Sequence, residues 1–370
     1  MIARGIAEAA VIDAIAACDP SKLVARAVAQ PAIVQRLAVR TVIGLAVGKA
    51  AIAMARGAGP VTRGLVVSTA HETPDLPSGW RYVRGSHPEP DAASEAAGTE
   101  ALSLIRSAAP ADIVLALISG GSSALLELPV PGVSIDELAS RVRARMRAGD
   151  SIHELNRLRT TLSAIKGGQL AAVSRASVIS LVISDVVGDE LAVIGSGPTI
   201  AHRASDHAEL IAPMSSFAEA VVDALGQRGI PARRIEAPFV EDVKEVAVQL
   251  ASSSDVVVGW GEPTVTLGAS SGEGGRARQL ALELARRLRG TDRSALVAGS
   301  DGVDGPVAMS GAAIAGAFVD GTTWDAIAAA GIDPEAALAR ADAGPALAAV
   351  GAQLITGATG INHADVMIVG

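Results

Sequence analysis

Ile113-Val114-Leu115-Ala116-Leu117-Ile118, followed at once by Ser119-Gly120-Gly121-Ser122-Ser123, is the part of this sequence that best indicates its fold class. An unbroken apolar run ends at a glycine-rich turn, and Ala124-Leu125-Leu126 then opens another apolar segment. Continuous apolar runs are typical of strands buried on both faces, as in a parallel sheet. The sequence therefore predicts a strand, a tight turn and a helix within an α/β sheet that helices cover on both sides.

Short strands and alanine-rich helices alternate along the rest of the chain. After a helical first forty residues, the predicted strands are 41–46, 64–68, 113–118, 178–184, 256–259, 265–267, 294–298, 354–356 and 366–369. The predicted helices are 49–56, 92–108, 135–147, 152–172, 206–228, 276–289, 312–317, 323–330 and 334–341. The segment 229–242, which contains Pro231 and Pro238, predicts a crossing between two α/β domains, 1–238 and 239–370. One continuous sheet is the alternative.

Composition excludes several classes of protein. The net charge is −8 and no basic cluster is interleaved with aromatic residues, so we expect no nucleic-acid partner. Apolar runs fall far short of the ~20 residues that span a bilayer, so we expect no membrane partner. Glu8 and Asp13 interrupt the N-terminal apolar pattern, which is unlike a secretory signal. The single Cys18 fits a reducing compartment, and we expect a cytoplasmic protein.

Lys49 directly follows Gly48, between a predicted strand and a predicted helix. The pattern is not a P-loop, because only three residues separate Gly44 from Gly48 and Ala50 replaces the Ser or Thr that would bind Mg²⁺. Lysine is disfavoured at a helix N-terminus, so this position indicates either an anionic ligand or a solvated side chain.

The turn Ser119–Ser123 combines backbone N–H groups with hydroxyls, which suits a phosphate or carboxylate. It lacks the Gly-x-Ser-x-Gly pattern of a nucleophile elbow. A tight turn without a ligand is the alternative interpretation.

Two loops that follow predicted strands carry closely spaced carboxylates. The first contains Asp185, Asp189 and Glu190, and the second contains Asp301 and Asp304 between glycines. Carboxylates this close repel one another unless Mg²⁺ or a basic side chain neutralises them. They are candidate magnesium ligands, with solvated, capping aspartates as the alternative.

Arg276 ends the glycine-rich segment Gly272-Glu273-Gly274-Gly275 at the start of a predicted helix. Its guanidinium could bind a carboxylate or phosphate in a bidentate manner, or it is one surface arginine among several. The segment also fits the dinucleotide pattern G-x-G-x-x-A, but no predicted strand directly precedes it. His87 is a candidate base or a hydrogen-bonded loop residue.

Taken in order, these loops resemble those of the glycerate 2-kinase family, whose members are often named hydroxypyruvate reductase. The resemblance covers nearly the whole chain. It rests on Val47–Ala50, His87–Asp91, Leu117–Leu126, Leu162–Gly168, Ile183–Asp189, Ser196–Thr199, Gly261–Val265, Gly272–Arg276, Ala298–Pro306, Asp320–Thr323 and Thr356–Asn362. It implies an N-terminal, mostly parallel, Rossmann-like sheet, a smaller C-terminal mixed α/β domain and an interdomain cleft.

The resemblance also implies transfer of the γ-phosphoryl group of ATP, with Mg²⁺, to the 2-hydroxyl of D-glycerate or a close 2-hydroxy acid. The catalytic residues would be Lys49 and Arg276, with Asp189 as the first candidate for activating the hydroxyl. We expect the nucleotide to be bound by Ser119, Gly120, Gly121, Ser122, Ser123, Lys166, Gly197, Asp301 and Gly302. The candidate magnesium ligands are Asp185, Asp189 and Asp304.

Ala277-Arg278-Gln279 follow Arg276 where the family usually has Asn-Gln-Glu. The change removes a polar side chain and adds positive charge, so it leaves the identity of the 2-hydroxy acid open. The alternative functions are an NAD(P)-dependent hydroxypyruvate reductase and a nucleotide-binding homologue without catalysis. The oligomeric state is open, with a homodimer as one option.

Overall fold

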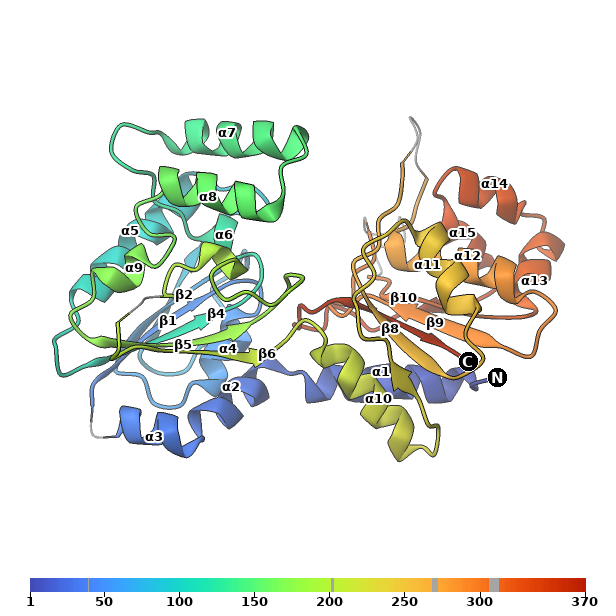
Figure 1. The fold of residues 1–370 in the computed structure, drawn as a ribbon, viewed down its shortest axis with the longest axis horizontal. Helices are drawn as coiled ribbons and strands as arrows, with labels where there is room; N and C mark the ends of the chain where they lie inside the picture. The colour runs from blue at the N-terminus through green and yellow to red at the C-terminus, as the bar shows by residue number, and fades with distance from the viewer. Residues whose placement is uncertain (39, 201–202, 268–271, 306–312) are drawn as a thin grey trace. The chain divides into compact units, whose positions relative to one another are not determined.

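The computed structural model describes residues 1–38, 40–200, 203–267, 272–305 and 313–370. The chain forms two compact units (Figure 1). The N-terminal unit is Asp19–Pro213, and the C-terminal unit combines Met1–Cys18 with Met214–Gly370. The expected boundary at residue 238, and the expected crossing at 229–242, therefore lie inside the C-terminal unit.

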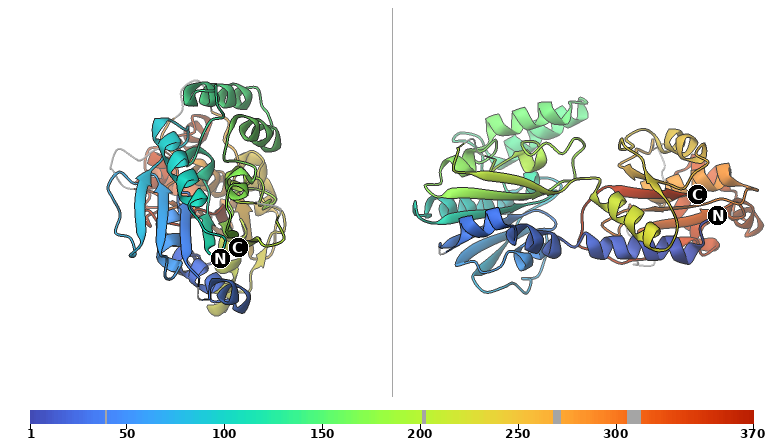
Figure 2. Two further views of the ribbon diagram at one scale, coloured as in Figure 1. Left: turned by 90° about the vertical axis from the view of Figure 1, so that its left-hand side faces the viewer. Right: turned by 60° about the horizontal axis from the view of Figure 1, so that its bottom comes forward.

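The first helix explains this division. Helix α1 (Arg4–Ala17) packs against α10 (Ser216–Gln227), and both helices cover the sheet of the C-terminal unit (Figure 1 and the right-hand view of Figure 2). The apolar residues of α1 are buried in one core with this sheet and α10, so the start of the chain folds with its end.

The N-terminal unit contains a six-stranded, fully parallel sheet in the order β3-β2-β1-β4-β5-β6, which confirms the predicted parallel arrangement. Its strands are β1 (Val42–Val47), β2 (Arg63–Ser68), β3 (Trp80–Arg84), β4 (Ile113–Ile118), β5 (Ser177–Ile183) and β6 (His207–Ala212). Parallel strands end at one edge, so the loops after β1, β4 and β5 leave the sheet at the same edge.

Helices cover both faces of this sheet. Alternate residues of β4 enter two different cores: Val114 and Ala116 pack toward α5, and Leu115 and Leu117 pack toward α2 and α4. This double burial is the physical reason for the unbroken apolar run. The helices are α2 (Pro20–Val28), α3 (Pro31–Leu37), α4 (Ala51–Gly57), α5 (Ala92–Arg106), α6 (Ser122–Leu125), α7 (Ile135–Arg147), α8 (Ile152–Leu162), α9 (Gln169–Ala172) and the 3₁₀ turn η1 (Ile194–Ser196).

The C-terminal unit contains a mixed sheet in the order β11-β10-β9-β12-β8-β7. Its strands are β7 (Arg233–Arg234), β8 (Val257–Gly261), β9 (Ser294–Ala298), β10 (Gly316–Asp320), β11 (Gln353–Leu354) and β12 (Asp365–Val369). The helices opposite α1 and α10 are α11 (Val243–Ala251), α12 (Arg276–Leu288), α13 (Thr323–Ala329), α14 (Pro334–Ala339) and α15 (Ala343–Ala349). None of the helices in the described ranges is both long and apolar enough to cross a membrane.

Several predicted elements were wrong. The expected helix 206–228 is strand β6 followed by α10, because Pro213 cannot lie within a helix. The expected helix 152–172 is α8 and α9, separated by a loop in which Gly167 and Gly168 have φ of 61° and 80°. The expected helix 312–317 falls partly on β10, with residue 312 outside the described ranges. No strand forms at 265–267, and the sequence did not reveal β3 or β7.

Candidate active site

Lys49 lies where the loops after β1 and β4 are joined. The Lys49 amide donates to Gly120 O at 2.9 Å, and the Ala50 amide donates to Ser119 Oγ at 3.2 Å. Gly48 is required there, because its φ is 131° and a Cβ would lie 2.1 Å from Ser119 Oγ. The Lys49 side chain is exposed, and its ammonium has no hydrogen-bond or ion-pair partner among the residues that the structure describes. Two backbone loops therefore hold a cation whose charge is available to a ligand.

His87 and Gly121 lie beside this lysine. A Cβ placed on Gly121, whose φ is 81°, would lie 3.2 Å from both His87 Cδ2 and Lys49 Cγ. Burial, and then the charge of Lys49, lower the pKa of His87. The imidazole is therefore neutral at physiological pH and does not add a second positive charge beside Lys49.

Ser123 is held by a directed chain of hydrogen bonds. Lys166 Nζ donates to Ser123 Oγ at 3.0 Å and to Ser123 O, and Ser196 Oγ donates to Asn156 Oδ1 at 2.7 Å. Ser123 Oγ lies 2.9 Å from Ser196 Oγ, which leaves Ser123 as the donor of that bond. Neighbouring Ser122 is buried, and its hydroxyl has no hydrogen-bond partner among the described residues.

Lys166 forms an ion pair with Glu127 inside the N-terminal unit. Its Nζ lies 3.1 Å from Glu127 Oε2, and each side chain is only 1% exposed. Burial lowers the pKa of Lys166, and the neighbouring carboxylate opposes that shift. Direct contact with a nucleotide, as the sequence suggested for Lys166, would need this buried pair to open. The geometry instead gives Lys166 the role of positioning Ser123.

Gly197 belongs to the same network through its backbone. Its carbonyl accepts a hydrogen bond from the Gly168 amide at 2.8 Å, and the Ser196 carbonyl accepts one from the Gly167 amide at 2.8 Å. Gly197 is buried and has a φ of 54°. Hydrogen bonds therefore connect Ser123, Lys166 and the loop of Gly197, whose predicted role in nucleotide binding stays a prediction.

Asp185 and Asp189 lie in the loop that follows β5. Both side chains are partly buried, and Asp189 has a left-handed backbone with a φ of 54°. The Asp189 amide donates to Val186 O at 3.1 Å, which makes the loop a tight turn. Because β5 is next to β4 in the parallel sheet, these carboxylates and the Ser119–Ser123 turn belong to the same sheet edge.

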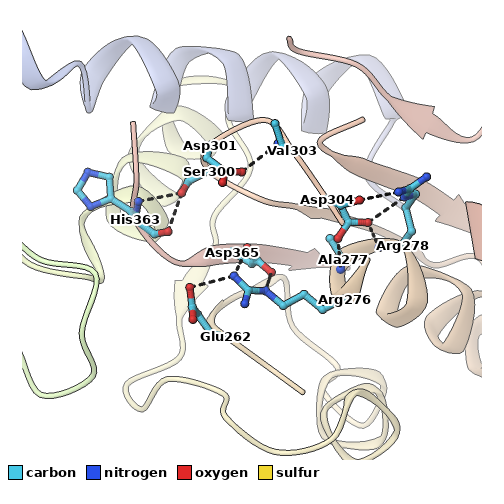
Figure 3. Close-up of polar contacts among 10 residues, drawn as sticks. All are labelled: Glu262, Arg276, Ala277, Arg278, Ser300, Asp301, Val303, Asp304, His363 and Asp365. Atoms are coloured by element: carbon cyan, nitrogen blue, oxygen red, sulfur yellow. Dashed lines mark hydrogen bonds and ion pairs between the residues drawn. The ribbon is translucent and has the colours of Figure 1, made fainter. Parts of the chain in front are cut away.

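Arg276, at the start of α12 in the C-terminal unit, is held by two carboxylates (Figure 3). Its Nε donates to Asp365 Oδ2 at 2.5 Å, and its Nη2 donates to Asp365 Oδ1 at 3.2 Å and to Glu262 Oε1 at 2.9 Å. The Arg276 side chain is 36% exposed, whereas Asp365 is 7% exposed. The bidentate contact fixes the plane of the guanidinium and leaves part of it accessible to a ligand.

The charge of this cluster depends on Asp365. Burial raises the pKa of Asp365 to about 7, against the opposing effect of Arg276. Asp304 and Glu262 add to the increase through like-charge repulsion. A large part of Asp365 is therefore protonated at neutral pH, which reduces the excess negative charge that would repel an anionic ligand from Arg276.

The raised pKa gives a prediction about stability. The pKa of Asp365 in the folded chain, about 7, lies above its ordinary value of 3.8. The contribution of this carboxyl to stability is therefore complete below its ordinary pKa and is lost as the pH rises through about 7. Relative to the native chain, Asp365→Asn should become progressively more stable between about pH 5 and pH 8, because asparagine does not ionise.

Urea unfolding of the Asp365→Asn variant and the native chain at both pH values measures this difference. A constant offset between the two proteins would reflect the lost contact with Arg276 and would leave the prediction intact. Parallel stability profiles across this range would contradict it.

Asp304 forms a second, fully buried ion pair in the C-terminal unit (Figure 3). One carboxylate oxygen accepts the Ala277 amide at 2.8 Å, and the other accepts the Arg278 amide and Nε, each at 2.9 Å. Both oxygens are thus engaged in a site where Arg278 is 1% exposed, which does not suit the expected role as a magnesium ligand. Ala277 and Gln279 are buried too, so the unusual residues after Arg276 face the interior of the unit.

Asp301 and Gly302 lie in a loop that is joined to the last glycine-rich segment. Asp301 Oδ1 accepts the Val303 amide at 2.9 Å, and the Asp301 carbonyl accepts the Thr359 amide at 3.1 Å. A Cβ on Gly302 would lie 1.9 Å from Gly357 O, so this contact requires glycine. Across the described ranges, no three His, Cys, Asp or Glu side chains converge closely enough to hold a metal ion.

Sequence reasoning missed Asp365 and gave no role to Glu262. A Cβ placed on Gly299 would lie 3.4 Å from Asp365 Oδ1 and 3.5 Å from Asp301 Oδ1, so these two carboxylates flank one glycine. The available signal was an acidic residue at the start of an apolar strand, since Asp365 directly precedes Val366-Met367-Ile368-Val369. A buried strand rarely begins with a carboxylate unless that carboxylate has a partner.

Comparison with known proteins shows similarity along both units. A model of a domain of unknown function, DUF4147, matches residues 6–225, and the MOFRL family model matches residues 255–365. The glycerate 2-kinase of Pyrococcus horikoshii is 32% identical over 88% of this chain and 86% of its own. A putative hydroxypyruvate reductase of Agrobacterium vitis is 32% identical over 86% of this chain and 96% of its own. The crystal structure of a glycerate kinase from Thermotoga maritima superimposes with a TM-score of 0.88 at 31% identity, covering 99% of this chain and 98% of that one.

Proposed function

Because this chain belongs to the glycerate 2-kinase family, we propose that it transfers the terminal phosphoryl group of ATP to the 2-hydroxyl of D-glycerate. The observation that carries the proposal is the similarity to glycerate kinases through both units. Lys49 supports it from the residues themselves, since two joined loops present its unpaired ammonium at the edge of the sheet.

Phosphoryl transfer depends on positioning and on neutralising charge rather than on covalent catalysis by the protein. In our proposal, the ammonium of Lys49 binds the transferred phosphoryl group, and the Ser119–Ser123 turn binds neighbouring phosphate oxygens. Arg276 binds a phosphate or the substrate carboxylate with the exposed part of its guanidinium. Asp189 accepts the proton of the 2-hydroxyl, with Asp185 as the second candidate.

Magnesium is part of the proposal, and the residues after β5 fit it. Mg²⁺ binds through one or two carboxylates together with substrate phosphates, which are the ligands that Asp185, Asp189 and a nucleotide offer. Asp304 does not fit, because a buried arginine and two amides already occupy its oxygens. When bound, Mg²⁺ neutralises charge on the phosphates of the nucleotide.

The proposal predicts ADP release that requires both ATP and D-glycerate. The product should be 2-phosphoglycerate, which enolase converts directly into phosphoenolpyruvate, whereas 3-phosphoglycerate is not a substrate of enolase. ADP release without product for enolase would indicate phosphorylation at another hydroxyl. The kcat/KM values for lactate and tartronate should be measured beside that for D-glycerate. Their ratios show which 2-hydroxy acid the site prefers, because an enzyme discriminates between substrates by kcat/KM.

A hydroxypyruvate reductase would instead oxidise NADH or NADPH with hydroxypyruvate and release no ADP with D-glycerate. The pattern Gly272–Ala277 gives this reading little support, because the described strand before it, β8, ends at Gly261. Tight ATP binding without turnover on any 2-hydroxy acid would favour a nucleotide-binding homologue without catalysis.

A further inference from the structure

A pocket of about 430 Å³ lies wholly within the N-terminal unit. It is lined by helix α7, by residues at and after the end of the Ser119–Ser123 turn, and by the segment Pro88-Glu89-Pro90. Arg159 of α8 completes the lining. Lys49, Ser119, Asp189 and Arg276 do not line this pocket, and Ser123 is the one residue that it shares with the turn to which we assign phosphate binding.

Helix α7 contributes four apolar side chains to the lining, in addition to Arg143 and Arg147. Leu138, Ala139, Val142 and Met146 face the pocket from one side of the helix. Three of them are at least nine-tenths buried, but Met146 is 55% exposed. A ligand with an apolar body would cover Met146, and the burial of that surface would favour binding.

Arg159 of helix α8 contributes a positive charge to the lining of the pocket. Arg159 is partly buried, and it has no hydrogen-bond or ion-pair partner among the residues that the structure describes. Glu127, the carboxylate whose charge acts on Arg159, is already paired with Lys166 at 3.1 Å. Burial lowers the pKa of Arg159, and the charge of Glu127 opposes that shift. A partly buried guanidinium without a partner is the group that an anion would neutralise.

The remaining charged residues of the lining do not cancel this charge. Arg143 donates from Nε to Glu89 Oε1 at 2.8 Å, and its Nη2 contacts the other oxygen, so these two residues neutralise each other. Arg147 is exposed at the rim and adds a further positive charge. The lining therefore combines an apolar wall with a net positive charge.

We propose that this pocket binds a small organic anion, in which an apolar body lies against α7 and a carboxylate or sulfonate group pairs with Arg159. Ser123 and Glu127 line the pocket and also belong to the hydrogen-bond network that positions the Ser119–Ser123 turn. A ligand in the pocket would therefore contact this hydrogen-bond network through Ser123 and Glu127. If the proposed kinase function holds, the occupant changes the KM for the nucleotide, whereas binding itself does not depend on that function.

Anilinonaphthalenesulfonate, an aromatic sulfonate with the required chemistry, is the probe for binding to the folded full-length chain. We expect a saturable rise in its fluorescence with one site per chain. Arg159→Gln should weaken binding roughly tenfold, because it removes a charge-assisted hydrogen bond. Arg157→Gln, a change of an exposed arginine on the same helix that does not line the pocket, is the matched control and should leave the Kd unchanged.

A second variant and a competition experiment complete the test. Ala139→Phe should abolish binding by filling the pocket, and the thermal unfolding of every variant shows whether it is folded. Benzoate should displace the probe and inorganic phosphate should not, because only benzoate offers an apolar body as well as a charge. Equal Kd values for the native chain, Arg159→Gln and folded Ala139→Phe would overturn the proposal. Displacement by D-glycerate would instead make the pocket part of the substrate site and refute its separate role.

Discussion

Replacing Lys49 or Arg276 by alanine should lower kcat/KM for D-glycerate at least ~100-fold, a loss of about 2.7 kcal/mol of transition-state stabilisation. Lys49 has an ammonium without a protein partner, and Arg276 has a guanidinium held in one plane by Asp365. Both cations would stabilise negative charge on the transferred phosphoryl group or on the substrate carboxylate. Steady-state kinetics of the purified variants measures the effect.

Matched variants separate this effect from a general loss of charge. Lys22→Ala and Arg287→Ala each remove an exposed cation, from the N-terminal unit and from helix α12 respectively, and should leave kcat/KM near the native value. Arg276→Lys should fail to restore activity, because an ammonium cannot reproduce the bidentate contact with Asp365. Near-native kinetics for both alanine variants would place the reaction elsewhere.

The double variant tests whether the two cations act as one functional group of residues. If the contribution of Lys49 depends on that of Arg276, the combined loss should be smaller than the product of the two single losses. Strict multiplication of the two effects would indicate that the residues act independently.

Replacing Asp304 by alanine should destabilise the C-terminal unit by roughly 3–5 kcal/mol, because it leaves the buried charge of Arg278 without its partner. Arg278 is 1% exposed, and its remaining carboxylate neighbour, Glu273, lies 3.6 Å away with its side chain 31% exposed. Chemical unfolding followed by the fluorescence of Trp260 and Trp324, both in this unit, measures the change.

Asp301→Ala is the matched control for Asp304→Ala, since Asp301 lies in the same loop and its carboxylate accepts the Val303 amide. Asp301→Ala should lower the free energy of unfolding by about 1 kcal/mol, the usual contribution of one hydrogen bond. If Asp304 were instead a magnesium ligand, as the sequence suggested, its removal would raise the Mg²⁺ concentration needed for activity while stability stayed near native. The two outcomes are distinguishable in one pair of variants.

Sequence reasoning failed where a local pattern fitted two structures. Residues 206–228 are helical in pattern, yet His207–Ala212 form an edge strand because they pair with β5. The apolar pattern of helix α1 does not name its partner, and its packing against α10 shows that it folds with the C-terminal unit. Pairing with a distant partner decided both cases, and a local pattern does not encode that partner.

The layered α/β architecture, the parallel sheet of the N-terminal unit and the positions of the glycine-rich loops could all be predicted from the amino-acid sequence. These features are local, because apolar runs and glycines act within a few residues of themselves. The pairing of charges could not be predicted and depends on the folded chain, in which Arg276 meets Asp365, Arg278 meets Asp304 and Lys166 meets Glu127. Arg276 and Asp365 are 89 positions apart, so their contact depends on how α12 and β12 pack in one unit. The energy of such an ion pair depends on the distance between the charges and on their burial, and neither quantity can be obtained from a single sequence.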